Sequence, residues 1–317
     1  MQYGCSPMNF RQFKAVQYYM KKFLPKLRVV ICMLLCLAAL IAFPCMAFTR
    51  NKVEADQSEA VLSVWQIDSF EGGKGSRADF LMNIGKDFAK NNDCYVTVVS
   101  LSAAAARLNL KEGNAPDIIS YGAGTYGIES YIYGFDCWCR GGYCLLTLDG
   151  DFSDVTAENT VVNEGKDNLA GAAALFCGLQ GAEFGKSTGA YVKLINGNFK
   201  YLLGTQRDVY RLKTRGVSFK VQPVTSFNDL YQNISIVSNS PKKEFAQKYI
   251  SYLLSRTGEV GKLGMISDGV TFDDEMRQME GVSFEYKLAS PVSAETFNSL
   301  KKYVTDGDIN MLKTSLK

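Results

Sequence analysis

The chain has 317 residues, of which 47% are hydrophobic and 21% charged, a composition that excludes disordered, collagen-like and disulfide-scaffold proteins. No acidic residue precedes Glu54, whereas eight Lys and Arg residues do, and removing these eight from the net charge of +3 leaves −5. This mildly acidic remainder gives no support for nucleic-acid binding. The chain contains no His, which excludes His-based triads, His metal sites and imidazole pH switches.

An uncharged apolar stretch covers residues 29–48 and follows a group of Lys and Arg residues. A basic region before an apolar stretch that ends in small residues such as Ala47 is typical of an export signal. We therefore expect residues 1–50 to be a signal peptide or a membrane anchor, since a stretch of this length also suffices to span a bilayer. We expect Met20, which two Lys follow, to be the initiator. Either form exports the remainder, to the extracellular face of the membrane or the periplasm.

Five cysteines lie beyond this segment, an odd number, so at least one stays unpaired. They are Cys94, Cys137, Cys139, Cys144 and Cys177. Their spacing lacks the paired C-x-x-C knuckles of a zinc site, and we expect neither a metal nor a cofactor. The sequence leaves open whether Cys139 and Cys144 form a disulfide or stay free thiols.

Predicted strands and helices alternate in the first part of the exported chain. Apolar runs bounded by turn residues indicate strands, and apolar residues recur at helical spacing after a cap at Ser76. The predicted order is strand 61–67, a helix after Ser76, strand 94–101, helix 103–111 and strand 117–121. This order predicts a parallel sheet covered by helices, with a ligand crevice at the strand ends, at residues 68–75 and 122–127.

The middle of the chain shows a different pattern of predicted elements, with short strand-like runs on both sides of one helix. The predicted strands are 144–148, 199–203 and 217–221, and the predicted helix is 168–179. Two later helices begin after Ser240 and Ser293. We therefore expect an α/β protein of two lobes. Residues 58–135 with about 237–290 would form the first lobe, 136–236 the second, and 291–317 the C-terminal helices.

Several local motifs have both a functional and a structural interpretation. Gly122–Gly127 matches G-x-G-x-x-G, but it follows the third strand rather than the first, which favours a flexible strand-end loop over a dinucleotide site. Phe70 and Trp138 lie beside charged and glycine residues, where an aromatic face could stack on a sugar or pack in the core. Asp68 and Glu71 could form a glycosidase pair, although solvated loop carboxylates are more common.

Five segments together resemble the extracellular solute-binding proteins of ABC importers, of the family-1, sugar-binding type. They are Val61–Trp65, Val96–Val99, the "G-x-x-P-D-hydrophobic" passage Gly113–Ile119, Ile195–Arg207 and the late helix Ala246–Ser255. The resemblance covers most of residues 60–317. It implies a two-lobe, type II periplasmic-binding-protein-like fold that closes by hinge motion around a solute and presents it to a membrane permease.

The resemblance implies a binding protein rather than an enzyme, a monomer that captures a carbohydrate. Gln206 departs from the family, which often has an aromatic residue there, and this departure bears on the ligand class. A secreted carbohydrate-active enzyme that uses Asp68 or Glu71, and a membrane-tethered sensor of the same fold, are the alternatives. The expected ligand-binding residues are Asp68, Phe70, Glu71, Gly72, Gly122, Gly124, Trp138, Thr205, Gln206, Arg207, Asn228 and Asp229.

Overall fold

The computed structural model describes Met33 and residues 60–317 except 166, 269 and 272. The chain divides into two units, residues 1–58 and 59–317, and the second carries the fold described below. The expected signal segment therefore lies outside the described residues, apart from Met33. Within the described part of the chain, no helix has both the length and the apolar character needed to cross a membrane.

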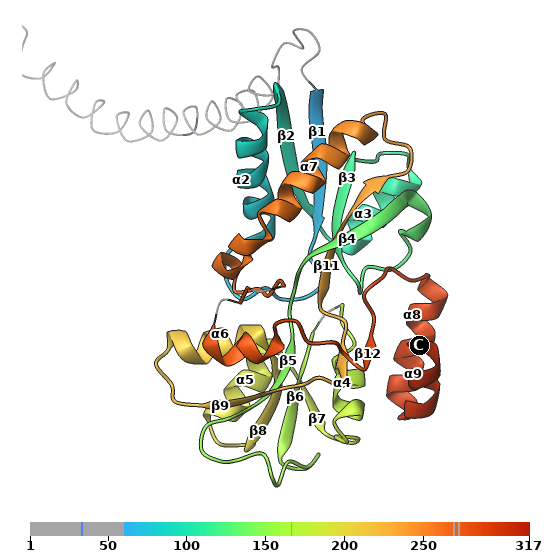
Figure 1. Ribbon diagram of the computed structural model, residues 1–317. Helices are drawn as coiled ribbons and strands as arrows, with labels where there is room; N and C mark the ends of the chain where they lie inside the picture. The colour runs from blue at the N-terminus through green and yellow to red at the C-terminus, as the bar shows by residue number, and fades with distance from the viewer. Residues whose placement is uncertain (1–32, 34–59, 166, 269, 272) are drawn as a thin grey trace, which may run out of the picture. The chain divides into compact units, whose positions relative to one another are not determined.

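The first sheet contains strands from both halves of the chain (Figure 1). Three parallel strands lie side by side, and two further strands continue the sheet in antiparallel pairing. The strand order is β2 (Cys94–Leu101), β1 (Ala60–Ile67), β3 (Ile118–Gly122), β11 (Tyr231–Val237) and β4 (Ile132–Arg140). The predicted parallel sheet is therefore correct for its first three strands and is extended by β11, which runs antiparallel to them, and by β4, which pairs antiparallel with β11.

Helices cover both faces of this sheet because successive strand side chains point to opposite faces. Leu62 and Val64 of β1 pack with α2 (Arg77–Ala89) and α7 (Lys243–Ser255). Ile67, on the other face, packs with α3 (Ala103–Lys111). The sheet thus has an apolar layer on each side, which fixes the register of β1.

The second sheet is built from the middle of the chain. Its order is β7 (Glu183–Lys186), β6 (Thr160–Glu164), β8 (Tyr201–Thr205), β5 (Tyr143–Thr147) and β9 (Lys220–Pro223). Its helices are α4 (Ala170–Phe176), α5 (Ser187–Ile195) and α6 (Gln206–Thr214). We call the parts built around the two sheets the first and the second lobe.

The chain crosses between the lobes more than once (Figure 1). It leaves β4 for β5 through Gly141 and Gly142, and it returns from β9 to β11 through β10 (Phe227–Asn228). The strand β12 (Tyr286–Lys287) pairs with β10 in parallel and makes a third crossing segment. The helices α8 (Ala294–Asp306) and α9 (Ile309–Ser315) then contact α4. Short 3₁₀ helices at Glu129–Tyr131, Thr257–Leu263 and Asp274–Met279 complete the described elements.

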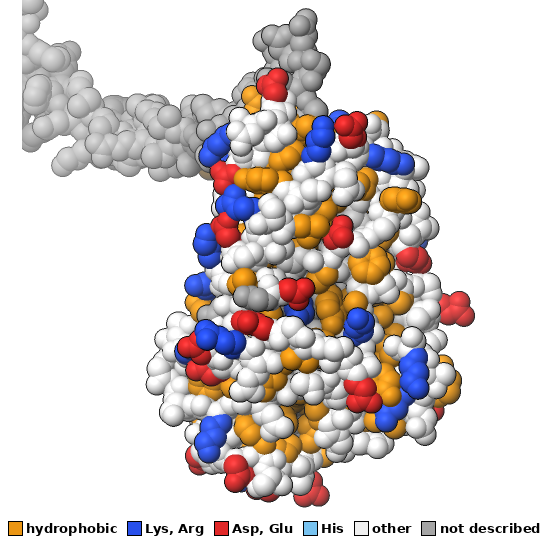
Figure 2. Space-filling view, in the orientation of Figure 1, with side chains coloured by type: hydrophobic (Ala, Val, Ile, Leu, Met, Phe, Trp, Pro, Cys, Tyr) orange, Lys and Arg blue, Asp and Glu red, His pale blue; other side chains and the backbone are white. Residues whose placement is uncertain are grey.

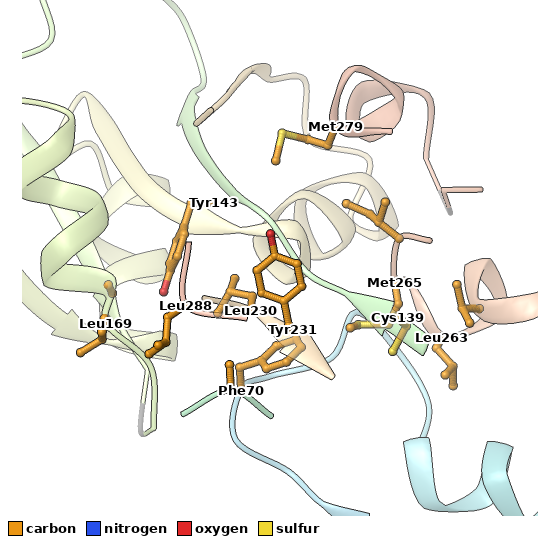
Figure 3. Packing of buried hydrophobic residues seen from close by; sticks show 14 of the residues in the cluster. Phe70, Cys139, Tyr143, Leu169, Leu230, Tyr231, Leu263, Met265, Met279 and Leu288 are labelled. Atoms are coloured by element: carbon orange, nitrogen blue, oxygen red, sulfur yellow. The ribbon is translucent and has the colours of Figure 1, made fainter. Parts of the chain in front are cut away.

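One hydrophobic cluster continues from the first lobe into the second. Figure 3 shows some of its members close to the crossing segments, among them Phe70, Tyr143 and Tyr231. Trp138, on β4, is 1% exposed and stacks on Phe80 with ring centroids 5.6 Å apart. The crossing segments are therefore packed in the core.

The sequence predicted several elements at their observed bounds, including β2 and α3. Ser76 caps α2 as expected, with its Oγ accepting from the backbone N–H of Asp79 at 3.2 Å. The strand predicted at 217–221 is wrong in its first half, because β9 begins only at Lys220. The elements β6, β7 and α5 were not predicted. The five cysteines of the described region are free thiols, and Cys139 and Cys144 are both buried.

Figure 2 shows one face of the molecule, where basic and acidic side chains are interspersed with hydrophobic atoms. This mixture agrees with the small net charge of the chain from residue 54 onward. It gives this face no extended surface of one sign.

Candidate functional site

A cleft of about 880 Å³ lies between the two lobes, at the end of β1. Its lining comes from the loop after β1, from the loop after β6, and from the starts of α5 and α6. The described lining residues are Asp68, Ser69, Phe70, Glu71, Gly72, Gly75, Ser76, Arg77, Glu164, Gly165, Asp167, Lys186, Ser187 and Arg207. Charged side chains of both signs therefore face this space, and Phe70 is the one aromatic residue among those described.

The first-lobe wall is the irregular loop 68–76, which the buried side chain of Arg77 stabilises through hydrogen bonds. Arg77 is 6% exposed, and its Nε donates to Oδ1 of Asp68 at 2.9 Å. The same guanidinium donates to the carbonyl of Phe70 and, over 3.0 Å, to Oε1 of Gln232 on β11. It also lies 4.6 Å from the centre of the Phe70 ring. One side chain thus fixes the path of the loop, and it covers the Phe70 ring.

The second-lobe wall consists of helix starts. Ser187 is the first residue of α5, and Arg207 is the second residue of α6. Asp208 is fully buried and accepts from the backbone N–H of Thr205 at 3.1 Å, which completes the capped start of α6. Asn163 donates to the same carboxylate at 2.8 Å, while burial raises the pKa of Asp208. Regular backbone hydrogen bonding therefore positions this wall.

Glu71 connects the two walls across the cleft. Its Oε1 lies 2.7 Å from Nη1 of Arg207, and its Oε2 accepts from Oγ of Ser187 at 2.6 Å. Its backbone carbonyl accepts from Nε2 of Gln206 at 3.1 Å. All three contacts join the first lobe to the second, so the structure has a closed cleft.

Gln206 is fully buried behind this contact and links it to the crossing segments. Its Oε1 accepts from the backbone N–H of Gly142 at 3.1 Å. A Cβ on Gly141 would lie 2.6 Å from the same oxygen, so the backbone passes the side chain at a distance that glycine permits. The residue that departs from the resembled family thus bridges the Glu71 loop and the first crossing.

Asn228 and Asp229 lie in the second crossing segment and are buried. Asp229 accepts from Oη of Tyr143 at 2.7 Å and from the backbone N–H of Leu169 at 2.6 Å. Burial raises the pKa of Asp229 to about 6, although both hydrogen bonds favour its ionised form. Nδ2 of Asn228 lies 3.4 Å from the carbonyl of Gly141. These two residues organise the crossing behind the cleft.

Two glycines permit close approaches beside the cleft. A Cβ on Gly122 would lie 1.3 Å from Oγ of Ser69, and one on Gly124 would lie 1.8 Å from the carbonyl oxygen of Asp167. Asp167 belongs to the second lobe, so the loop after β3 touches the other lobe directly. Neither distance leaves room for a side chain.

The structure brings five of the twelve expected ligand-binding residues together in the cleft lining: Asp68, Phe70, Glu71, Gly72 and Arg207. Gly122, Gly124, Thr205, Gln206, Asn228 and Asp229 lie beside or behind it, in the contacts just described. Trp138 lies in the core, where its Nε1 donates to Oγ of Ser120 at 3.0 Å.

Sequence reasoning missed the parts of the cleft that depend on long-range contacts. Arg77 directly follows Ser76, the cap of α2. Its position at the start of a helix was the only signal in the sequence, and that position does not indicate that the side chain is buried. Lys186 and Ser187 begin a helix that was not predicted. Glu164 is the last residue of β6 and Asp167 lies in the loop after it, and because β6 was also not predicted, nothing directed attention to them.

No family model matches the chain, and no curated protein matches it. Solved structures do. IdiA (FutA) from Trichodesmium, in complex with iron and citrate, superposes with a TM-score of 0.54 at 12% identity, over 81% of this chain and 100% of that one. The maltodextrin-binding protein MalE1 from L. casei BL23, without ligand, gives 0.51 at 11% identity, over 82% and 97%. These likenesses confirm the expected two-lobe periplasmic-binding-protein-like fold.

Proposed function

We propose that this chain is the exported solute-binding component of an ABC importer, which captures a small solute between its lobes and presents it to a membrane permease. The observation that carries the proposal is the cleft of about 880 Å³, which both lobes line with charged side chains. Its size is that of a small-molecule site. The fold supports the proposal only by analogy, since one fold serves many functions.

The charged lining favours a polar, charged solute over the carbohydrate that the sequence suggested. The carbohydrate hypothesis came from the resemblance to sugar-binding proteins, and Phe70 and Trp138 offered the aromatic faces that could stack on a sugar. Phe70 is 7% exposed under the guanidinium of Arg77, and Trp138 is 1% exposed in the core. The described lining residues instead include four carboxylates and three basic side chains.

The glycosidase alternative receives little support from the same side chains. Such an enzyme needs two carboxyl groups that face one substrate. Asp68 is instead held by Arg77 at 2.8 Å, and Glu71 by Arg207 at 2.7 Å. Each carboxylate is already engaged in a contact of the cleft wall.

Thermal unfolding of the purified protein against a solute panel tests the proposal. The panel contains carbohydrates, amino acids, carboxylic acids, polyamines and metal ions. A solute at 100 times its dissociation constant adds about 2.7 kcal/mol, which corresponds to a shift of several degrees. A shift with one chemical class, without any product in the mixture, is the expected result.

Two arginines at opposite ends of α6, Arg207 within its first turn and Arg215 directly after its last residue, provide a matched pair of variants. Arg207 lines the cleft at the start of the helix, whereas Arg215 lies exposed at its end, outside the cleft lining. Arg207→Gln should reduce the shift, and Arg215→Gln should leave it unchanged. Equal shifts in both variants would place binding elsewhere, and the absence of any shift would count against solute capture.

A further inference from the structure

The cleft contains a carboxylate-binding arrangement that the protein fills with its own side chain. Arg207 Nη1 and Ser187 Oγ contact the two different oxygens of Glu71, at 2.7 and 2.6 Å. Both donors belong to the second lobe, and the carboxylate belongs to the first. Two donors on the two oxygens of one carboxylate is the usual geometry of strong carboxylate recognition.

Arg211 determines the direction of the Ser187 hydroxyl. Its Nη1 donates to Ser187 Oγ at 3.1 Å, and the same atom lies 3.3 Å from Oδ1 of the buried Asp208. A guanidinium has only donors, so the Ser187 oxygen must accept from Arg211 and its own proton is left for a partner across the cleft. Arg211 is therefore a positioning residue that makes Ser187 a donor toward an anion.

The contact between Glu71 and Arg207 is exposed enough for a soluble anion to compete for it. The side chains of Glu71 and Arg207 are 38% and 32% exposed, so solvent reaches both. Ion pairs with this exposure contribute little to stability. Lys186, which also lines the cleft, adds positive charge beside Ser187. A soluble anion could thus take the place of Glu71 without a large loss of stability.

We propose that Glu71 is an internal substitute for the ligand: without a solute its carboxylate fills the subsite of Ser187 and Arg207 and holds the lobes together, and a solute that carries a carboxylate displaces it. This rests on the proposed function and names the class of solute, a small molecule with at least one carboxylate. Glu71 then sets both the resting closure of the lobes and the affinity for the solute.

The test uses Glu71→Ala, with Glu71→Gln as the variant that keeps the side-chain length, and two independent measurements. Small-angle scattering without any solute should give a larger radius of gyration for Glu71→Ala than for the unaltered protein. Calorimetric titration with succinate should show at least tenfold tighter binding to Glu71→Ala, because the subsite is vacant. Succinamide, which has the same skeleton without charge, should show no such gain.

Two controls separate this proposal from general effects of lost charge. Glu158 is exposed and outside the cleft lining, and Glu158→Ala should change neither reading. Arg207→Gln combined with Glu71→Ala should abolish the gain for succinate. A Glu71→Ala protein with an unchanged radius of gyration, or with no gain for succinate, would overturn the proposal.

The outcomes also separate this proposal from solute capture itself. In one outcome, Glu71→Ala opens the lobes and binds succinate more tightly, but no panel solute stabilises the unaltered protein. That outcome supports Glu71 as the internal substitute and contradicts capture of a panel solute. If a neutral sugar binds and Glu71→Ala gains nothing for succinate, capture stands and the carboxylate subsite is wrong.

Discussion

The two walls of the cleft reach the same surface by different means. The first-lobe wall is an irregular loop, and its positions depend on the side chain of Arg77, which contacts Asp68, Phe70 and Gln232. The second-lobe wall is made of helix starts, and backbone hydrogen bonds with a buried cap at Asp208 hold it. A wall that depends on one side chain should lose its conformation when that side chain is removed. In a helical wall many hydrogen bonds share the stabilisation, so no single side chain has the same effect.

The loop wall is also the one that supplies Glu71. A loop can move its side chains by small backbone changes, while a helix start keeps its donors in place. The difference between the walls therefore agrees with the proposed roles: the second lobe holds the donors of Ser187 and Arg207 in place, and the first lobe supplies the carboxylate of Glu71, which a solute displaces.

The largest expected effect comes from removing the brace of the loop wall. Arg77→Ala should lower the free energy of unfolding by about 3 to 4 kcal/mol, because it leaves the Gln232 oxygen and the Phe70 carbonyl without their donor and removes a buried ion-pair partner. The value is at the lower end for a buried pair because the Asp68 side chain is 53% exposed. Urea unfolding measures it.

An exposed arginine gives the matched control. Arg277, 69% exposed, pairs with Asp274 three residues before it, and Arg277→Ala should change the free energy of unfolding by less than about 0.5 kcal/mol. A loss below about 1 kcal/mol in Arg77→Ala would mean that the loop holds its own conformation, and the contrast between the walls would disappear.

The next largest effect is the pH dependence of stability that Asp229 causes in the crossing segment between β9 and β11. The folded pKa of Asp229 is about 6, against about 3.9 in an unfolded chain. Between these values the folded protein binds more protons than the unfolded chain, so this contribution to stability is fully present below about pH 4 and is lost as the pH rises to 6. At about 1.4 kcal/mol per pKa unit, the loss is up to about 3 kcal/mol.

Asp229→Asn removes this titration and keeps an oxygen that accepts from Tyr143. The free energy of unfolding of the unaltered protein, minus that of the variant, should therefore fall between pH 4 and pH 6 and stay constant above pH 7. Urea unfolding of both proteins at each pH measures the difference, in which other titrating groups cancel. A difference that does not vary with pH would contradict the raised pKa.

The start of the first lobe was predictable from local patterns, whereas the second lobe and the cleft were predictable only in part. The strands β1 to β3, with α2 and α3, follow from apolar periodicity and a cap, because those signals lie within a few residues. Asp68 and Glu71 were found because they directly follow a strand. The sequence around Trp138 allows both a ligand contact and core packing, and only the position of β4 against Phe80 decides between them.

The contacts between the lobes lay beyond local reasoning. Ser187 and Glu71, which meet across the cleft, are 116 residues apart in sequence. Arg77 and Gln232 are 155 residues apart, although both belong to the first lobe. Nothing in a single sequence links such pairs, since their proximity depends on how distant segments pair in the folded chain. The resemblance to binding proteins named Arg207, which the structure places in the cleft lining, but it could not name Glu71 as the acid that pairs with it.

The smallest effect on stability should come from the direct backbone contact between the lobes, and it tests closure separately from side chains. A Cβ on Gly124 would lie 1.8 Å from the Asp167 carbonyl oxygen, so Gly124→Ala must displace one of the two backbones, and we expect the lobes to move apart. Because each lobe keeps its own sheet, the free energy of unfolding should fall by only about 1 to 2 kcal/mol. Gly189 lies in α5, where a Cβ would meet nothing within 4 Å, and Gly189→Ala should add about 0.5 to 1 kcal/mol without changing the radius of gyration. Small-angle scattering should show an increase for Gly124→Ala alone. An unchanged radius there would mean that the loops yield locally, and closure would then depend on Glu71 and its two donors rather than on the fit of the backbones.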